Sequence, residues 1–337
     1  MNRDIQLLTS EHTLGDEALL NLLTTNDTNV IDELHSTARK VTDRWHGRIV
    51  KTRGLIEISN YCHNNCYYCG IRAGNANVQR YRLTHDEIMQ CSLAGATLGF
   101  NTFVLQGGED LQHSTEWVER VVADIRSAHP TAAITLSLGE RTKDDYKRWY
   151  DAGANRYLLR HETANPKHYA KLHPKQMSWQ RRIDCLHALK DIGYETGTGI
   201  MVGSPFQTIN DIILDLRLME RFRPEMIGIG PYVSHHDTPF ADKPNGSVEL
   251  TLRLISILRL MHPQANIPAT TSLGTLATDG RLLGVEAGAN VVMPNLSPLN
   301  VRKAYSLYDG KICTDLEAAE SRRLLAQQFA EKGYELD

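Results

Sequence analysis

Long apolar runs, a strong charge of one sign and a disulfide framework are all missing from this 337-residue sequence. No apolar run reaches the roughly 18–20 residues that a bilayer-spanning helix requires. The N-terminus carries scattered charges in place of the apolar core of a signal peptide. The formal charge of −3 gives no sign of the basic face that nucleic-acid binding uses. We therefore expect a cytoplasmic protein with neither a membrane nor a nucleic-acid partner.

Cysteine is scarce, but its distribution is uneven. The sequence has six cysteines, and three of them, Cys62, Cys66 and Cys69, fall within eight positions. In a reducing compartment such a group is more typical of metal binding or redox chemistry than of a disulfide. Cys91 and Cys185 fall among apolar residues of predicted helices, and we interpret them as small core residues.

The pattern of apolar residues changes near residue 54. Residues 1–50 carry apolar stripes at helical spacing, whereas β-rich runs alternate with amphipathic segments from there on. There are eight such runs: Leu55–Ser59, Thr102–Gln106, Ala133–Leu138, Arg156–Arg160, Gly199–Val202, Met226–Tyr232, Ile267–Thr271 and Asn290–Met293. Eight strand–helix repeats predict an α/β protein with a (β/α)₈ barrel of the TIM type, and a doubly wound open sheet is the alternative.

This pattern also predicts the organisation of the chain. We expect an N-terminal helical extension over residues 1–50 and the barrel over residues 51–300. Residues 301–337 should form a C-terminal cap that belongs to the same domain, with a helix over residues 316–332.

The three clustered cysteines follow the first predicted strand, at the mouth where such barrels keep their active sites. A closed iron–sulfur site usually takes four thiolates, so three leave one iron free to hold another ligand. A zinc site would need a fourth ligand. His63 is a candidate, but its position next to Cys62 makes convergence on one metal awkward.

The spacing Cys62-x₃-Cys66-x₂-Cys69, with Tyr68 before the last cysteine, resembles the signature of the radical S-adenosylmethionine (SAM) superfamily. Gln106-Gly107-Gly108-Glu109, after the second strand, resembles the GGE motif of that superfamily. The resemblance implies one 4Fe–4S cluster whose open iron chelates the methionine end of SAM. Reduction then cleaves SAM and releases a 5′-deoxyadenosyl radical.

Longer stretches across residues 50–313 are similar to the FeFe-hydrogenase maturase family HydE, which is close to biotin synthase and methylornithine synthase. They include RYLLRHETANP, IGIGPYVSHHDTP and NIPATTSLGT. The resemblance implies eight contacts with SAM: Tyr68, Gln106, Gly108, Glu109, Ser137, Glu162, Arg182 and Met201. It implies five residues of an inner substrate cavity: Thr135, Arg160, Thr270, Thr271 and Tyr305. A deep arginine needs a negative partner, so Arg160 indicates an anionic ligand or an internal carboxylate.

The family's implied role is assembly of the dithiomethylamine-bridged diiron subcluster of the hydrogenase. The implied substrate is small and anionic or zwitterionic, an iron–cysteine carbonyl–cyanide complex, and the implied partners are the other hydrogenase maturases. Some relatives bind a second cluster near the C-terminus. Here Cys313 has no cysteine after it, so we expect one cluster.

Other readings differ in chemistry. A methylornithine synthase-like or biotin synthase-like enzyme would use the same cluster on an amino-acid-type substrate. An electron-transfer or structural metal protein is the non-enzymatic alternative, and the missing fourth cysteine argues against it. His235-His236-Asp237 looks like a metal motif, but adjacent histidines in an extended segment should point to opposite sides.

Overall fold

The computed structural model describes residues 2–337 and has a ring of parallel strands at its centre. Six strands pair in the order β2-β3-β4-β5-β6-β8, and every pairing is parallel. They are β2 (Gly54–Ser59), β3 (Thr102–Gly107), β4 (Ala133–Ser137), β5 (Arg156–Leu158), β6 (Glu195–Thr198) and β8 (Met226–Ile227). Two short strands, β7 (Met201–Val202) after β6 and β9 (Gly230–Pro231) after β8, pair with each other.

Single bridges close this sheet into a barrel. Met226 bridges to Asn266, and Pro268 bridges to Val291 of β10 (Val291–Val292). Asn295 then bridges back to Leu55 of β2, so the last segment returns to the first strand. The predicted barrel is therefore confirmed, and the open doubly wound sheet is wrong.

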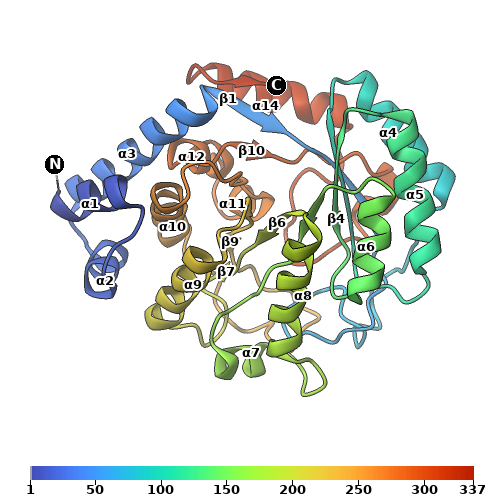
Figure 1. Ribbon diagram of the computed structural model, residues 1–337, viewed down its shortest axis with the longest axis horizontal. Coiled ribbons are helices and arrows are strands. Elements are labelled where there is room, and N and C mark those ends of the chain that lie inside the picture. The colour runs from blue at the N-terminus through green and yellow to red at the C-terminus, as the bar shows by residue number, and fades with distance from the viewer. Residues whose placement is uncertain (1) are drawn as a thin grey trace.

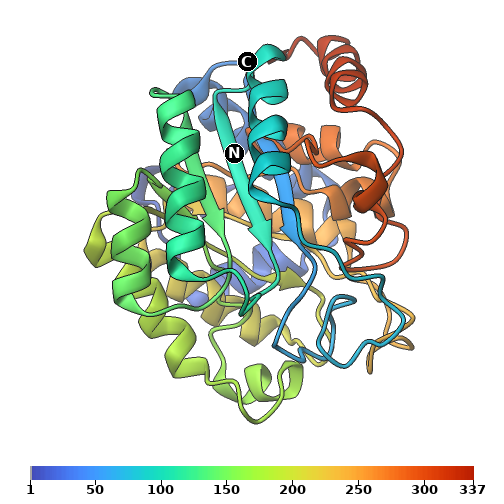
Figure 2. The ribbon, with the colours of Figure 1, turned by 90° about the vertical axis from the view of Figure 1, so that its right-hand side faces the viewer.

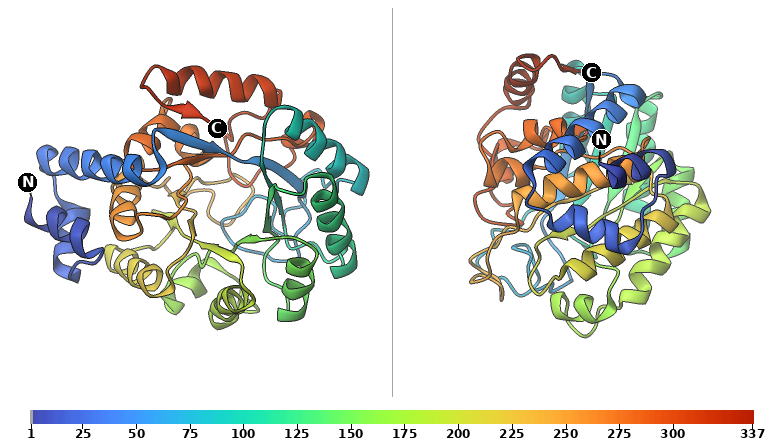
Figure 3. Two further views of the ribbon diagram at one scale, coloured as in Figure 1. Left: turned by 45° about the horizontal axis from the view of Figure 1, so that its top comes forward. Right: turned by 90° about the vertical axis from the view of Figure 1, so that its left-hand side faces the viewer.

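Helices surround the strands, as Figure 3 shows in its left-hand view. Those that alternate with the strands are α4 (His85–Thr97), α5 (Thr115–Ala128), α6 (Lys143–Asp151), α7 (Pro166–Leu172), α8 (Trp179–Ile192), α9 (Ile209–Phe222), α10 (Val248–Met261), α11 (Thr271–Leu276), α12 (Gly280–Glu286) and α13 (Leu299–Arg302). Capping boxes start α4 at Thr84 and α9 at Thr208. None of the helices in residues 2–337 is long and apolar enough to cross a membrane.

Both ends of the chain pack on the outside of the barrel. Three N-terminal helices, α1 (Arg3–Glu11), α2 (Asp16–Thr24) and α3 (Thr28–His46), cover α9 and α10 (Figures 1 and 3). The sequence did not reveal β1 (Ile49–Thr52), which pairs with β10 and with the C-terminal strand β11 (Glu335–Leu336). The predicted C-terminal helix is α14 (Ala318–Ala330).

Two predicted strands are misplaced. The fifth main strand is Glu195–Thr198, and the predicted Gly199–Val202 contains only the short β7. The predicted seventh strand, Ile267–Thr271, forms only a bridge at Pro268, and Thr271 begins α11. The stretch around Gly197, Gly199 and Gly203 carries few side chains with strand preference, and Pro268 in the seventh run has no N–H to donate to a neighbouring strand, so the local pattern placed both boundaries poorly.

We expect Trp149→Ala to lower the free energy of unfolding by about 3–5 kcal/mol. Trp149 is fully buried on α6, and its indole N–H donates to Thr115 O over 3.0 Å. Urea unfolding followed by circular dichroism measures the change. Trp45→Ala is the matched control because Trp45 is 50% exposed on α3. Equal losses of unfolding free energy in the two variants would contradict the assignment of Trp149 to the core.

Candidate active site

The three clustered cysteines lie on an irregular loop, residues 60–81, that leaves β2 at its carboxyl end. Figure 2 shows this light-blue segment beyond the arrowheads of the strands. The loop contains no helix or regular strand, so its backbone groups need partners from elsewhere in the molecule.

Arg80 supplies many of these partners from within the loop. Its guanidinium donates to four carbonyl oxygens: Asn60 O at 2.5 Å, Ile71 O at 2.8 Å, Arg72 O at 2.7 Å and Asn75 O at 3.2 Å. A planar fork with five N–H groups suits this arrangement, whereas a lysine ammonium has only three donors. Arg80 therefore ties both ends of the loop together, and no motif in the sequence indicated this role.

Neighbouring elements hold the loop from three further directions. His63 N–H donates to Glu109 O, Tyr67 N–H to Leu172 O, and Gly70 N–H to Leu307 O, at 2.9–3.1 Å. A side chain at Gly108 would collide with the loop, because a Cβ there would lie 2.1 Å from Tyr61 O. The glycine of the GGE-like motif thus lets the two loops approach each other closely.

Burial keeps the cysteine thiols protonated when no metal is bound. It raises the pKa of Cys62, raises that of Cys66 well above its usual value, and raises that of Cys69 to about 12. Iron must therefore displace the protons as it binds.

The loop opens onto a cavity of about 340 Å³ inside the barrel mouth. All eight residues predicted to contact SAM line this cavity, together with the three cysteines. Four of the five predicted substrate residues line it as well, namely Arg160, Thr270, Thr271 and Tyr305. Thr135 does not belong to the lining and is buried within β4. The individual roles of these residues stay predictions.

One wall of the cavity carries a chain of charged groups that begins at His63. His63 Nε2 lies 3.2 Å from Glu109 Oε2, and Arg182 lies 3.9 Å from the other oxygen of that carboxylate. Although burial opposes it, the pKa of Glu109 is lowered by the hydrogen bond from His63 and by the charge of Arg182. Glu109 is therefore held as a carboxylate, and His63 is occupied with it instead of completing a zinc site.

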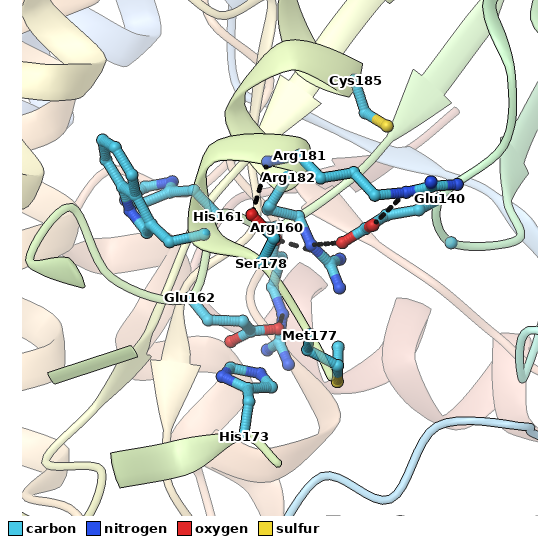
Figure 4. Close-up of polar contacts among 12 residues, drawn as sticks. Glu140, Arg160, His161, Glu162, His173, Met177, Ser178, Arg181, Arg182 and Cys185 are labelled. Atoms are coloured by element: carbon cyan, nitrogen blue, oxygen red, sulfur yellow. Dashed lines mark hydrogen bonds and ion pairs between the residues drawn. The ribbon is translucent and has the colours of Figure 1, made fainter. Parts of the chain in front are cut away.

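Arg182 is itself held by a carboxylate that the sequence analysis missed. Arg182 Nε lies 2.7 Å from Glu140 Oε1, and Arg181 reaches the other oxygen of Glu140 at 3.1 Å (Figure 4). Only 8% of Arg182 is exposed, whereas the Arg181 side chain is 61% exposed. Arg182 lines the cavity, whereas Arg181 does not.

Glu162 and Arg160 pair inside the cavity mouth, and not on the outer surface. Arg160 Nε lies 3.0 Å from Glu162 Oε1, so the arginine has the internal carboxylate that its position required (Figure 4). Glu162 has a left-handed backbone with φ of 65°, and its N–H donates to Gly199 O. Its second oxygen, Oε2, is buried without a hydrogen-bond partner in residues 2–337. Such an acceptor fits a ligand that brings hydroxyl donors.

The far side of the cavity holds a second ion pair that sequence reasoning also missed. Lys311 Nζ lies 2.5 Å from Glu57 Oε1 and 3.0 Å from Tyr305 O. Both side chains line the cavity and are almost completely buried. Glu57 was hidden within an apolar β2 run, and Lys311 lies more than 250 positions away in an irregular segment, so no local pattern links them.

The histidine pair after β9 corrects one expectation. The rings of His235 and His236 stack at 4.5 Å between centroids, so they do not point to opposite sides. With Asp309 they form a compact group. However, His235 Nδ1 accepts the Asp237 N–H at 3.1 Å, which places the ring proton on Nε2, the nitrogen nearer Asp309. We therefore assign no metal to this group.

The remaining cysteines stay apart from the mouth. Cys91 and Cys185 are buried in the apolar core around β2–β6, as expected. Of residues 2–337, no fourth cysteine lines the cavity. The donor set thus fits a 4Fe–4S cluster with one iron free of protein ligands.

A parallel barrel with three cysteines at its mouth and an adjoining polar cavity defines a radical SAM enzyme. The family model described as "Radical SAM superfamily" matches residues 56–219. The chain is 43% identical to the [FeFe] hydrogenase maturase subunit HydE of Thermotoga maritima, over 88% of this chain and 84% of that protein. It belongs to the radical SAM superfamily and, within it, to the HydE family.

Two further comparisons agree with this placement. The chain is 33% identical to 3-methylornithine synthase of Methanosarcina barkeri, over 88% of this chain and 83% of that protein. It superposes on the crystal structure of methylornithine synthase (PylB) with a TM-score of 0.85 and 28% identity, covering 99% of this chain and 97% of that one. The superfamily implies a 4Fe–4S cluster and SAM as cofactors.

We expect Arg80→Lys to reduce the iron content after anaerobic reconstitution at least twofold, because three donors replace five at the loop carbonyls. Iron per chain and the visible absorbance of the cluster measure the effect. Arg120→Lys is the control, since its side chain is 76% exposed on α5. Equal iron contents in the two variants would contradict the role of Arg80.

Proposed function

We propose that this chain acts as a HydE-type maturase, a radical SAM enzyme in the assembly of the diiron subcluster of [FeFe] hydrogenase. The observation that carries the proposal is its 43% identity to HydE of Thermotoga maritima over 88% of the chain. That span extends beyond the cysteine loop into the segments that supply the rest of the cavity wall.

The resident cofactors would supply a 5′-deoxyadenosyl radical by reductive cleavage of SAM, and this chain's residues would bind and orient the reactants. Cys62, Cys66 and Cys69 would hold the cluster. Arg182 presents a guanidinium suited to a carboxylate, and Glu109 is a carboxylate suited to an ammonium group. The wall of the mouth would keep water from the reactive centre.

Six further residues would complete the nucleoside side of the SAM site. Glu162 offers its free oxygen to the ribose hydroxyl groups. Tyr68 O–H lies 3.2 Å from Nε2 of His173, which itself stacks on Tyr169 and bonds to the Tyr169 carbonyl through Nδ1. This contact would fix the ring of Tyr68 beside the cluster. Gln106, Gly108, Ser137 and Met201 line the same space.

The substrate would occupy the part of the cavity beyond SAM. Arg160, Thr270 and Thr271 supply a positive charge and hydroxyl groups there, and Tyr305 O–H is within 3.3 Å of Gln106 Nε2. Lys311, the ammonium found only in the structure, adds a second positive charge. A small anionic or zwitterionic molecule, such as an iron–cysteine carbonyl–cyanide complex delivered by a partner maturase, fits these charges.

We expect Glu162→Gln to raise the dissociation constant of SAM about tenfold, because an amide accepts hydroxyl donors more weakly than a carboxylate does. Isothermal titration of the reconstituted enzyme measures it. Glu331→Gln, at the exposed end of α14, is the control with the same charge change. An unchanged dissociation constant in Glu162→Gln would remove Glu162 from the SAM site.

In a maturation assay, we expect the wild-type chain, the other maturases and apo-hydrogenase together to yield hydrogen evolution. Cys66→Ala should abolish both this activity and 5′-deoxyadenosine formation, because only two cluster thiolates remain. Cys313→Ala is the control, since Cys313 does not line the cavity. Formation of 5′-deoxyadenosine without hydrogenase activation would reject the maturase role, and conversion of lysine to methylornithine would favour the alternative enzyme.

A further inference from the structure

A strained aromatic residue protrudes from the rim of the barrel beside the cysteine loop. Ser204, Pro205, Phe206 and Gln207 form a tight turn, closed by Gln207 N–H donating to Ser204 O over 3.0 Å. Phe206 occupies its third position with φ of 68°, where glycine or asparagine is normal. Its side chain is nevertheless 51% exposed. This backbone conformation is strained for a residue with a Cβ, yet half of the residue stays exposed, which points to a role outside folding.

Edge-on aromatic contacts connect this ring to the cysteine loop. Phe206 and Phe240 lie 5.8 Å apart between ring centroids, and Phe240 and Tyr67 lie 6.0 Å apart. Tyr67 is the residue between Cys66 and Tyr68. A partner seated on Phe206 would therefore lie beside the loop that holds the cluster.

The surroundings of Phe206 are positively charged, although the whole chain has a net charge of −3. Lys171 Nζ lies 5.4 Å and Lys243 Nζ 5.8 Å from the centroid of the Phe206 ring. Lys167 lies one turn before Lys171 on α7, the helix at the bottom of Figure 1, and Lys175 follows in the next loop.

Few acidic residues balance these lysines. From residue 165 to residue 178 the sequence contains no aspartate or glutamate, and neither does the turn at Phe206. In residues 238–247 the one acidic residue is Asp242, whose carboxylate lies 3.6 Å from the neighbouring Lys243 ammonium. His168 Nε2 contacts Pro205 O at 2.9 Å, so α7 and the turn form one continuous surface.

We propose that this surface is the docking face for a small acidic one-electron carrier protein, such as a flavodoxin. The face consists of Phe206, Lys167, Lys171, Lys175 and Lys243. An acidic partner complements the lysines, and the exposed ring provides an apolar anchor. The class of enzyme needs one electron per SAM cleaved, and this face adjoins the cysteine loop. A small, charge-steered contact is typical of transient electron-transfer complexes. The inference rests on the radical SAM class alone and does not depend on the maturase role.

The proposed step is a simple electron transfer. The anionic flavin hydroquinone of the carrier loses one electron and becomes the neutral semiquinone, so no proton moves in this step. The oxidised cluster gains that electron. No covalent bond between the two proteins forms or breaks.

Phe206→Gly and the double variant Lys171→Glu/Lys243→Glu test the face on the reconstituted holoenzyme. Binding of oxidised flavodoxin, measured by calorimetry at low and high salt, gives a readout that is independent of turnover. Stopped-flow bleaching of the cluster then compares reduced flavodoxin with dithionite, a small reductant that needs no docking face. Lys40→Glu/Lys332→Glu changes the net charge equally at other surface positions and is the control.

We expect both test variants to bind flavodoxin about tenfold more weakly than the wild type does, and to accept its electron about tenfold more slowly. Their reduction by dithionite should be unchanged. Phe206→Gly should unfold at the same or a higher temperature, because glycine relieves the left-handed strain. The salt dependence of binding should decrease in the double lysine variant but persist in the control. Wild-type binding and rates with flavodoxin in both test variants would overturn the proposal. Equally slowed cluster reduction by dithionite would also overturn it. Weakened hydrogenase maturation with unchanged electron transfer from flavodoxin would overturn it too, and would assign the face to a maturation partner.

Discussion

Hydrogen bonds to the backbone of the cysteine loop hold the active site in place. Residues 60–81 have no regular secondary structure, yet they must present three thiols in a fixed arrangement. Arg80 bonds four carbonyls within the loop, and Glu109, Leu172 and Leu307 accept N–H groups from it. These acceptors come from three widely separated parts of the chain. The position of the thiols is therefore a property of the whole barrel mouth and not of the loop alone.

The cavity behind the loop is built from opposed charges. Arg182 lies between Glu140 and Glu109, Arg160 pairs with Glu162, and Lys311 pairs with Glu57. Each charge would be unfavourable in this buried space alone, but each has a partner within 4 Å. The pairs hold these side chains in place before a ligand arrives, so less reorganisation is needed on binding.

Many residues of the site could be predicted from short sequence segments because they lie at or after strand ends. Gln106 ends a β-rich run, Glu109 and Glu162 closely follow one, and Tyr68 lies in the loop after the first run. The strand ends of a parallel barrel meet at one mouth. The resemblance to radical SAM proteins then indicated which of these polar residues contact SAM. Thr135 shows the limit of this reasoning, since it lies inside β4 and does not reach the cavity.

The sequence by itself determined the barrel class, the cysteine spacing and the family, because these depend on periodicity and on motifs within short segments. Tertiary structure alone decided barrel closure through isolated bridges, the bonds of Arg80 to the loop, and the pairing of Glu57 with Lys311. It also decided that His235 and His236 stack, and that Phe206 stands exposed beside Lys171 and Lys243. The physical reason is range: hydrophobic periodicity reports which face of an element is buried, whereas charge pairs and loop contacts join residues that only folding brings together.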